Sequence, residues 1–181
     1  MADMDRMALN RETLLARMSA HVLQHGLQTA SLRPLAAAAG TSDRMLIYHF
    51  GSRDALLMAV LDHIATTMAA GLDQLFDGQG GMSSGELLRA VWGVARNDEF
   101  RPAMRIWLEL VAIAARDPEG HGAIATRIAD GFLVWTTGHL KTPDEAPLVL
   151  TCFEGMLVLQ EAGHGATVDA AIDTLCARLT P

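Results

Sequence analysis

A short stretch of the sequence, between residues 31 and 53, gathers side chains that are suited to binding phosphate and base edges. It contains serine hydroxyls, arginines, a tyrosine and a histidine within two expected short helices. The N-terminus of each helix adds free backbone N–H groups and partial positive charge, which also attract phosphate. The candidate DNA-contacting residues are Ser31, Arg33, Ser42, Arg44, Met45, Tyr48, His49 and Arg53.

Each of these residues also has a plainer interpretation. Arg44 and Tyr48 could be solvated surface residues, and His49 could cap a helix or pack against it. Ser31 and Ser42 stand where helix caps are expected, and capping does not exclude phosphate contact. We interpret Arg44 as a DNA contact because of the motif around it.

The elements that must position these side chains are two helices joined by a tight turn. Residues 31–39 end in four alanines followed by Gly40, and residues 43–49 form the next expected helix. Small side chains let two helices approach closely, and glycine takes the left-handed conformation that reverses the chain. The pattern predicts a helix-turn-helix whose recognition helix, residues 43–49, enters a major groove about 12 Å wide.

Residues 29–57 resemble the DNA-binding domain of the TetR family of bacterial repressors, and the similarity extends over about residues 10–60. Three residues depart from the usual family pattern: Asp43 stands where a basic residue is common, Ile47 where an aromatic is common, and Arg53 where lysine is common. The segments that carry the resemblance are Ala39-Gly40, Ser42, Leu46 with Tyr48-His49-Phe50, Ser52-Arg53 before Ala55-Leu56-Leu57, and the later Phe153-Glu154-Gly155-Met156.

The resemblance implies a homodimeric, ligand-responsive repressor that binds an inverted-repeat DNA operator. A small molecule in the C-terminal domain would shift the long helix after the recognition helix and change the spacing of the two DNA-binding heads. Effector and operator would then each weaken the binding of the other. We expect a transcriptional regulator and no enzyme.

Helical periodicity continues through the rest of the chain, and strand patterns are weak. The fold class expected is all-α, with a three-helix DNA-binding head in residues 1–52 and a larger helical ligand-binding and dimerisation domain in residues 53–181. The helices expected, about nine in all, cover residues 10–25, 31–39, 43–49, 53–76, 83–97, 100–117, 121–140, 144–163 and 167–179.

The C-terminal region carries three tryptophans on three different expected helices, among other large apolar residues. Such residues fill cores in most proteins, but together they could also line an apolar ligand pocket. Glu109, on an apolar helix, is either a surface residue or the polar group of that pocket. The candidate ligand-binding residues are Trp92, Phe100, Met104, Trp107, Glu109, Phe132, Trp135 and Phe153.

The last two expected helices, residues 144–163 and 167–179, are candidates for a dimer interface. The first is apolar on more than one face, which predicts burial on both sides. The second has an apolar stripe, so two copies of the pair could form a four-helix bundle. Alternatively, both helices only close the core of one protomer.

Charge and composition exclude several other functions. The net charge is −7, yet residues 1–60 hold six arginines against five acids, and the remainder holds eight basic and sixteen acidic residues. Attraction to phosphate is therefore confined to the head. The seven histidines show no metal-ligand spacing and no phosphate-binding glycine loop is present, so we expect no metal, cofactor or catalytic site.

Two further expectations concern the cysteines and the location of the protein. Cys152 and Cys176 lie among apolar residues and are interpreted as buried thiols, because neither has a charged neighbour that would activate it as a redox sensor. No apolar run reaches about 20 residues and residues 1–10 do not read as a leader, so the protein is expected in the cytoplasm.

A competing interpretation is a helical protein-interaction or ligand-sequestering module that has lost DNA binding. The acidic balance of the chain and Asp43 at the start of the recognition helix favour it. Because binding through phosphates weakens steeply as salt rises, a salt titration on random duplex separates the two interpretations.

Overall fold

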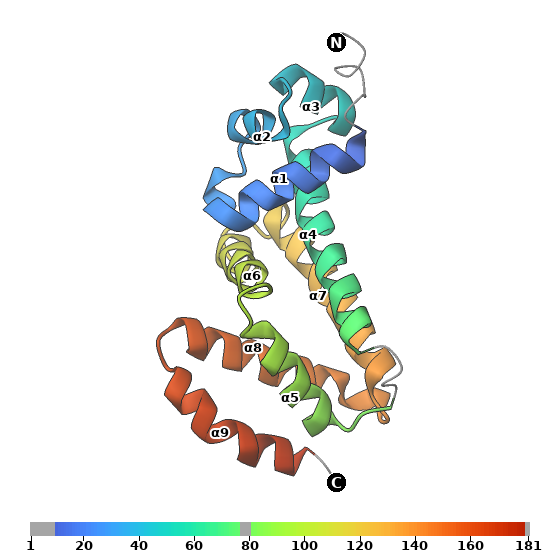
Figure 1. Ribbon diagram of the computed structural model, residues 1–181, viewed down its shortest axis with the longest axis vertical. Helices are drawn as coiled ribbons and strands as arrows, with labels where there is room; N and C mark the ends of the chain where they lie inside the picture. Colours follow the sequence, from blue (N-terminus) through green and yellow to red (C-terminus); the bar gives the residue numbers. More distant parts are fainter. Residues whose placement is uncertain (1–9, 77–80, 180–181) are drawn as a thin grey trace. The chain divides into compact units, whose positions relative to one another are not determined.

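The computed structural model describes residues 10–76 and 81–179, so the N-terminal stretch in which no leader was expected lies almost wholly outside the described residues. Helices dominate this part of the chain (Figure 1), where the β-type pairing is one isolated bridge between Met82 and Leu140. The elements are α1 (Arg11–His25), η1 (Leu27–Thr29), α2 (Leu32–Ala39), α3 (Asp43–Phe50), α4 (Arg53–Leu75), α5 (Ser84–Ala95), α6 (Arg101–Ala114), α7 (His121–His139), η2 (Pro143–Glu145), α8 (Ala146–Glu161) and α9 (Gly165–Arg178).

Caps and glycines explain where the first helices begin and end. The Asn10 side chain accepts a hydrogen bond from the Thr13 N–H at 2.7 Å, and the Ser52 side chain accepts one from the Ala55 N–H at 3.1 Å. Gly26 follows α1 with a φ of +89°, a conformation that glycine adopts without strain. These local signals mark where the helices begin and end.

The chain divides into two compact units. Of the described residues, the first comprises 10–67 and 105–124, and the second comprises 68–76, 81–104 and 125–179. In the first, α1 packs on α2 and α2 packs on α3 around fully buried residues. The most deeply buried side chains there include Leu14, Met18, Val22, Leu35, Ala39, Leu46, Leu56 and Val60.

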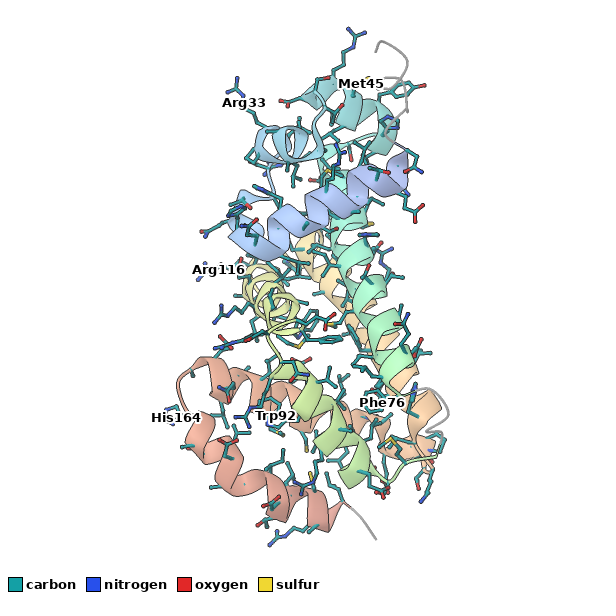
Figure 2. All side chains as sticks on the ribbon, in the orientation of Figure 1. Arg33, Met45, Phe76, Trp92, Arg116 and His164 are labelled. Carbon is teal, nitrogen blue, oxygen red and sulfur yellow. The ribbon has the colours of Figure 1, made fainter. Side chains whose placement is uncertain are left out.

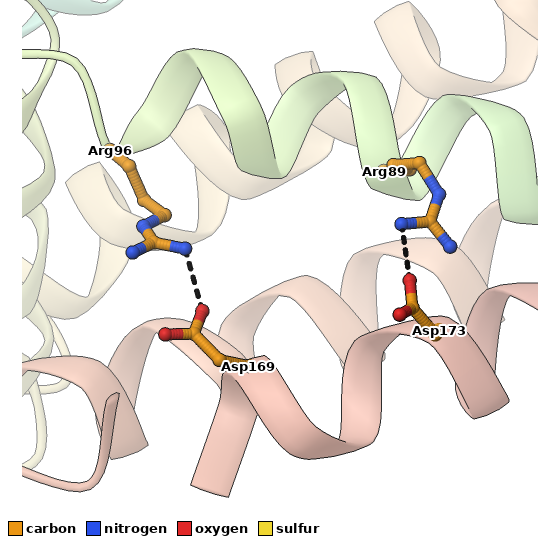
Figure 3. A network of polar contacts seen from close by, with 4 residues as sticks. All are labelled: Arg89, Arg96, Asp169 and Asp173. Carbon is orange, nitrogen blue, oxygen red and sulfur yellow. Dashed lines mark hydrogen bonds and ion pairs between the residues drawn. The ribbon is translucent and has the colours of Figure 1, made fainter. Parts of the chain in front are cut away.

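In the second unit, α5, α8 and α9 pack side by side (Figure 1). Leu87, Leu88 and Val149 lie in its core with no more than 2% of their surface exposed. Two ion pairs join α5 to α9 (Figure 3): Arg89 to Asp173 at 2.7 Å and Arg96 to Asp169 at 2.6 Å. All four side chains are about half exposed or more, so these pairs orient α9 more than they stabilise it.

The predicted all-α class is confirmed, and every expected helix is present with ends shifted by at most a few residues. The additional 3₁₀ helix η1 was not expected. The predicted domain boundary follows the motif, whereas the compact units assign residues 53–67 and 105–124 to the same unit as the head. The helices α4, α6 and α7 therefore contribute residues to both units.

Helix α4 is the one described helix that is long and apolar enough, by length and composition alone, to cross a membrane. The sequence predicts no membrane-spanning segment, and a single apolar helix of this kind does not by itself establish one. The helix also carries Asp62, His63 and Asp73 among its apolar residues, and 28% of its most apolar window is buried in the protein. It is the helix that directly follows the helix-turn-helix.

Candidate nucleic-acid interface

The turn between α2 and α3 has the geometry that a helix-turn-helix requires. Gly40 takes a left-handed conformation with φ +71° and ψ 35°, and its N–H donates to the carbonyl of Ala37 at 3.1 Å. The N–H of Thr41 donates to the carbonyl of Ala36 at 3.0 Å. The Ser42 side chain then caps α3 by accepting a hydrogen bond from the Met45 N–H at 3.3 Å. The expected cap at Ser42 is therefore present.

Helix α3 has an inward face and an outward face. Leu46 is fully buried and Phe50 is 8% exposed, whereas Met45 is 42% and Tyr48 is 78% exposed. Arg44 is also exposed. At 3.6 residues per turn, Arg44, Met45 and Tyr48 lie within an arc of about 100° on one side of the helix. This face carries one cation, one hydroxyl and one flexible apolar side chain, which can reach phosphates and base edges.

The other candidate DNA contacts surround this face. Arg33 and Arg53 are exposed, and Figure 2 shows Arg33 and Met45 at the periphery of their helices, pointing away from them. Ser31 occupies the N-cap position of α2, but its side chain makes no capping hydrogen bond, so the cap expected there is absent. The His49 ring lies edge-on between Tyr48 and Phe50, with centroids 5.4 Å and 6.5 Å away. His49 therefore contacts the rings of its two neighbours, and its role as a DNA contact stays a prediction.

Two arginines of α1 contact the motif, and the sequence pattern predicted neither contact. Arg17 donates a hydrogen bond from Nη1 to the carbonyl oxygen of Ala39 at 3.1 Å. The guanidinium of Arg11 lies 5.0 Å from the centroid of the Phe50 ring, within the range of a cation–π contact. One signal was available: Arg17 lies three residues after the buried Leu14 and so borders the inward stripe of α1.

Three of the candidate ligand-binding residues come together in the second unit. Trp92 (Figure 2) is 3% exposed, and its ring lies edge-on to Phe153 with centroids 6.3 Å apart. Trp92 and Met104 line a pocket of about 160 Å³. The indole Nε1 of Trp92 and the Oε1 of Gln160 are buried without a hydrogen-bond partner in the described part of the chain. The pocket residues are Trp92, Ala95, Arg96, Arg101, Met104, Leu157, Gln160 and Glu161.

The other candidates in this unit lie apart from that pocket. Trp135 donates to Asp73 at 2.6 Å, stacks on His139 with centroids 4.1 Å apart, and meets Phe76 edge-on at 5.7 Å. Phe100 lies against α4, where a Cβ on Gly71 would be 3.3 Å from the ring. Phe132 is half-buried on α7.

Trp107 and Glu109 belong to the first unit, with the head. Trp107 is half-buried. The carboxylate of Glu109 accepts a hydrogen bond from the backbone N–H of Leu27 at 2.7 Å. Glu109 thus binds the backbone of the first unit, a contact that the sequence did not predict, and its role in ligand binding stays a prediction.

The described residues contain no cluster of three or more His, Cys, Asp or Glu side chains that could hold a metal ion. Cys152 is half-buried and Cys176 is 3% exposed. Burial raises the pKa of the Cys176 thiol above its ordinary value, which keeps it protonated and unreactive near neutral pH. Cys176 is therefore a buried thiol, as the sequence predicts.

Comparison with known proteins supports what the geometry indicates. Residues 21–60 match the family model described as bacterial regulatory proteins, tetR family. No curated protein matches the chain by sequence. Among solved structures, SCO7518 from Streptomyces coelicolor A3(2) superposes with a TM-score of 0.71 at 21% identity, over 95% of this chain and 98% of its own. The multidrug binding protein EbrR, complexed with proflavin, gives 0.68 at 22%, over 93% and 98%.

A third solved structure, the TetR-family member SCO1917 from Streptomyces coelicolor A3, gives a TM-score of 0.66 at 20% identity, over 94% of this chain and 98% of its own. The matched segment contains the whole of α2, the turn and α3, and the shared fold extends over nearly the full chain. The chain thus carries its helix-turn-helix, in α2 and α3, inside a segment that matches the tetR-family model, and it shares the all-α fold of these solved structures.

Proposed function

We propose that this protein binds an inverted-repeat DNA operator through α3 and represses transcription until a small molecule releases it. The observation that carries the proposal is the exposed face of α3, where Arg44, Met45 and Tyr48 have no place in the core. The first residues of a recognition helix are those that reach base edges, and Arg44 is its second residue. Ser42, Tyr48 and Arg53 surround it and hold phosphates.

The effector is a small molecule bound in the second unit. Its pocket of about 160 Å³ has the volume of a cavity that admits one aromatic ring. The indole N–H of Trp92 and the Oε1 of Gln160, which have no hydrogen-bond partner among the described residues, offer one donor and one acceptor beside apolar Met104 and Leu157. EbrR, which shares the fold, is a multidrug binding protein that has been crystallised with imidazole and with proflavin. A compact ring compound with polar edges fits this chemistry.

Dimerisation through α8 and α9 gives the two-fold symmetry that an inverted repeat requires. Leu148, Cys152, Gly155 and Leu159 follow one another at intervals of four, three and four residues, so they lie on one face of α8. Leu148 is 46% and Leu159 is 41% exposed. An exposed apolar stripe with a central glycine supports a close helix–helix contact with a second copy.

Repression with release by an effector follows if operator and effector prefer different conformations. Each ligand then weakens the binding of the other by the same factor. A protein with this role must reach the chromosome, and we therefore place it in the cytoplasm.

The test begins by selecting duplexes from a random pool with the wild-type protein. Fluorescence anisotropy then compares a selected duplex with its scrambled version from 50 to 200 mM salt. We expect tighter binding to the selected duplex, a steep salt dependence on both, and inverted repeats among the selected sequences. Recovery of unrelated sequences with equal affinity would instead favour a helical module without operator recognition. Adding imidazole or proflavin tests release directly.

A further inference from the structure

The turn between α1 and α2 has a backbone conformation that favours glycine. After His25, Gly26 has φ +89° and ψ 162°, a backbone region that residues with a side chain rarely occupy. The next residue, Leu27, begins the 3₁₀ helix η1, which leads into α2. The direction in which α2 and then α3 leave α1 therefore depends on this turn.

A carboxylate from a distant part of the sequence holds the turn. Glu109 Oε2 accepts a hydrogen bond from the Leu27 N–H at 2.7 Å, across 82 residues. A Cβ on Gly26 would lie 3.3 Å from Oε1 of Glu109 and 3.4 Å from Oε2. The carboxylate of Glu109 thus packs directly against Gly26, and a side chain at position 26 would crowd it. Leu27 is 5% exposed, so water cannot easily replace the carboxylate.

The helix that carries Glu109 also takes part in the pocket described above. Arg101 and Met104, on the first turn of α6, line that pocket. Glu109 follows them by eight and five residues in the sequence and belongs to the other unit. Helix α6 therefore contributes pocket-lining side chains to the second unit and, to the first, the carboxylate that binds the head.

We propose that Glu109 is a positioning residue for DNA binding: its carboxylate fixes the α1–α2 turn to α6 and so sets the orientation in which α3 meets DNA. This rests on the proposed DNA-binding function. A hydrogen bond to a charged acceptor is stronger than a neutral one, and a buried N–H that loses its acceptor is costly.

If Glu109 only stabilised the fold, its removal would lower the melting temperature without changing DNA affinity. Glu86 provides a matched case, because its Oε2 also accepts a backbone N–H, that of Ser83, at 2.8 Å, but in the other unit. Both Glu86→Ala and Glu109→Ala remove a carboxylate from a backbone N–H, and both should lower the melting temperature. Only the change at Glu109 should alter binding to DNA.

The experiment compares wild type, Glu109→Ala, Glu109→Gln and Glu86→Ala on the duplex selected by the wild type, at a temperature where all four are folded by circular dichroism. We expect about tenfold weaker binding for Glu109→Ala, since loss of a charge-assisted hydrogen bond has that magnitude. Glu109→Gln retains an acceptor oxygen and should remain within about threefold of wild type. Glu86→Ala should bind as wild type does. Where Glu109→Ala does not fold, Glu109→Asp tests the same bond by shortening the side chain.

Hydrogen exchange of the Leu27 amide provides the second measurement. The amide should be protected in wild type and Glu109→Gln and should exchange faster in Glu109→Ala. Faster exchange in Glu109→Ala with unchanged DNA affinity would show that Glu109 only stabilises the turn, and would overturn the proposal. Unchanged exchange of the Leu27 amide in Glu109→Ala would also overturn it. A wild-type protein that selects no duplex would overturn the proposed function instead, and this inference with it.

Discussion

The guanidinium of Arg17 on α1 donates a hydrogen bond to the carbonyl oxygen of Ala39, the last residue of α2, at 3.1 Å. The last carbonyls of a helix lack partners within the helix, so Arg17 satisfies one of them. A Cβ on Gly40 would lie 3.2 Å from the same Nη1 atom. The guanidinium of Arg17 therefore links α1 to the turn of the helix-turn-helix and stabilises that turn.

Arg17→Ala should lower the free energy of unfolding by about 1–2 kcal/mol, because it leaves the Ala39 carbonyl without its partner. Urea denaturation followed by circular dichroism measures the change. Arg33→Ala is the matched control, since Arg33 is exposed on α2 and its loss should stay within about 0.5 kcal/mol. Equal effects of the two substitutions would show that the Arg17 bond contributes nothing to the stability of the motif.

Arg44→Ala should weaken binding to the selected operator by about 1–3 kcal/mol and relax preference at one base pair per half-site, because arginine is the usual bidentate reader of guanine. Arg53→Ala, at the start of α4, should weaken binding to all sequences alike and flatten the salt dependence. Anisotropy on selected and scrambled duplexes distinguishes the two effects. If Arg44→Ala lowers affinity equally on both duplexes, Arg44 contacts only phosphate.

The sequence predicted the helices and the motif well because both depend on local signals. Periodicity, Gly40 and Ser42 act over a few residues, and the structure places them as expected. Contacts across the fold left no such signal. The Glu109–Leu27 bond and the Arg89–Asp173 pair join residues 82 and 84 positions apart, and no pattern within either helix indicates its partner.

The sequence of helix α8 does not show which of its apolar faces is buried within the protomer. It is apolar on several faces, so periodicity alone cannot separate the residues of the protomer core from those open to a second copy. The structure separates them: Leu157 is 3% exposed, whereas Leu159, two positions later, is 41% exposed. Only packing against α5 and α9 determines which face is left open.

This separation gives a test of the proposed dimer. Leu159→Glu places a charge on the exposed stripe of α8 and should convert a dimer to a monomer at micromolar concentration, because an unpaired charge is strongly unfavourable in an apolar interface. Light scattering measures the mass, and circular dichroism should show unchanged helicity. Leu75→Glu is a control, since Leu75 is 52% exposed at the end of α4, away from α8 and α9 in sequence. Retention of the wild-type mass by Leu159→Glu would place any interface elsewhere.

The last prediction concerns the stability of the head in mild acid. His21 on α1 has its Nε2 atom buried without a hydrogen-bond partner in the described part of the chain, and its ring centroid lies 4.7 Å from that of His25. Burial, and secondly the charge of His25, lowers the pKa of His21 below its ordinary value of 6.5. In the range between the two pKa values the unfolded chain binds more protons than the folded one, so stability rises with pH there. Stability is accordingly highest above about pH 6.5 and is lost as the pH falls through the folded-state pKa.

Wild type should therefore melt at a lower temperature at pH 5 than at pH 7.5. The difference between the two melting temperatures should be smaller in His21→Gln and intermediate in His25→Gln. Thermal denaturation of the three proteins at the two pH values measures this, and a difference as large in His21→Gln as in wild type would assign the acid sensitivity to other groups.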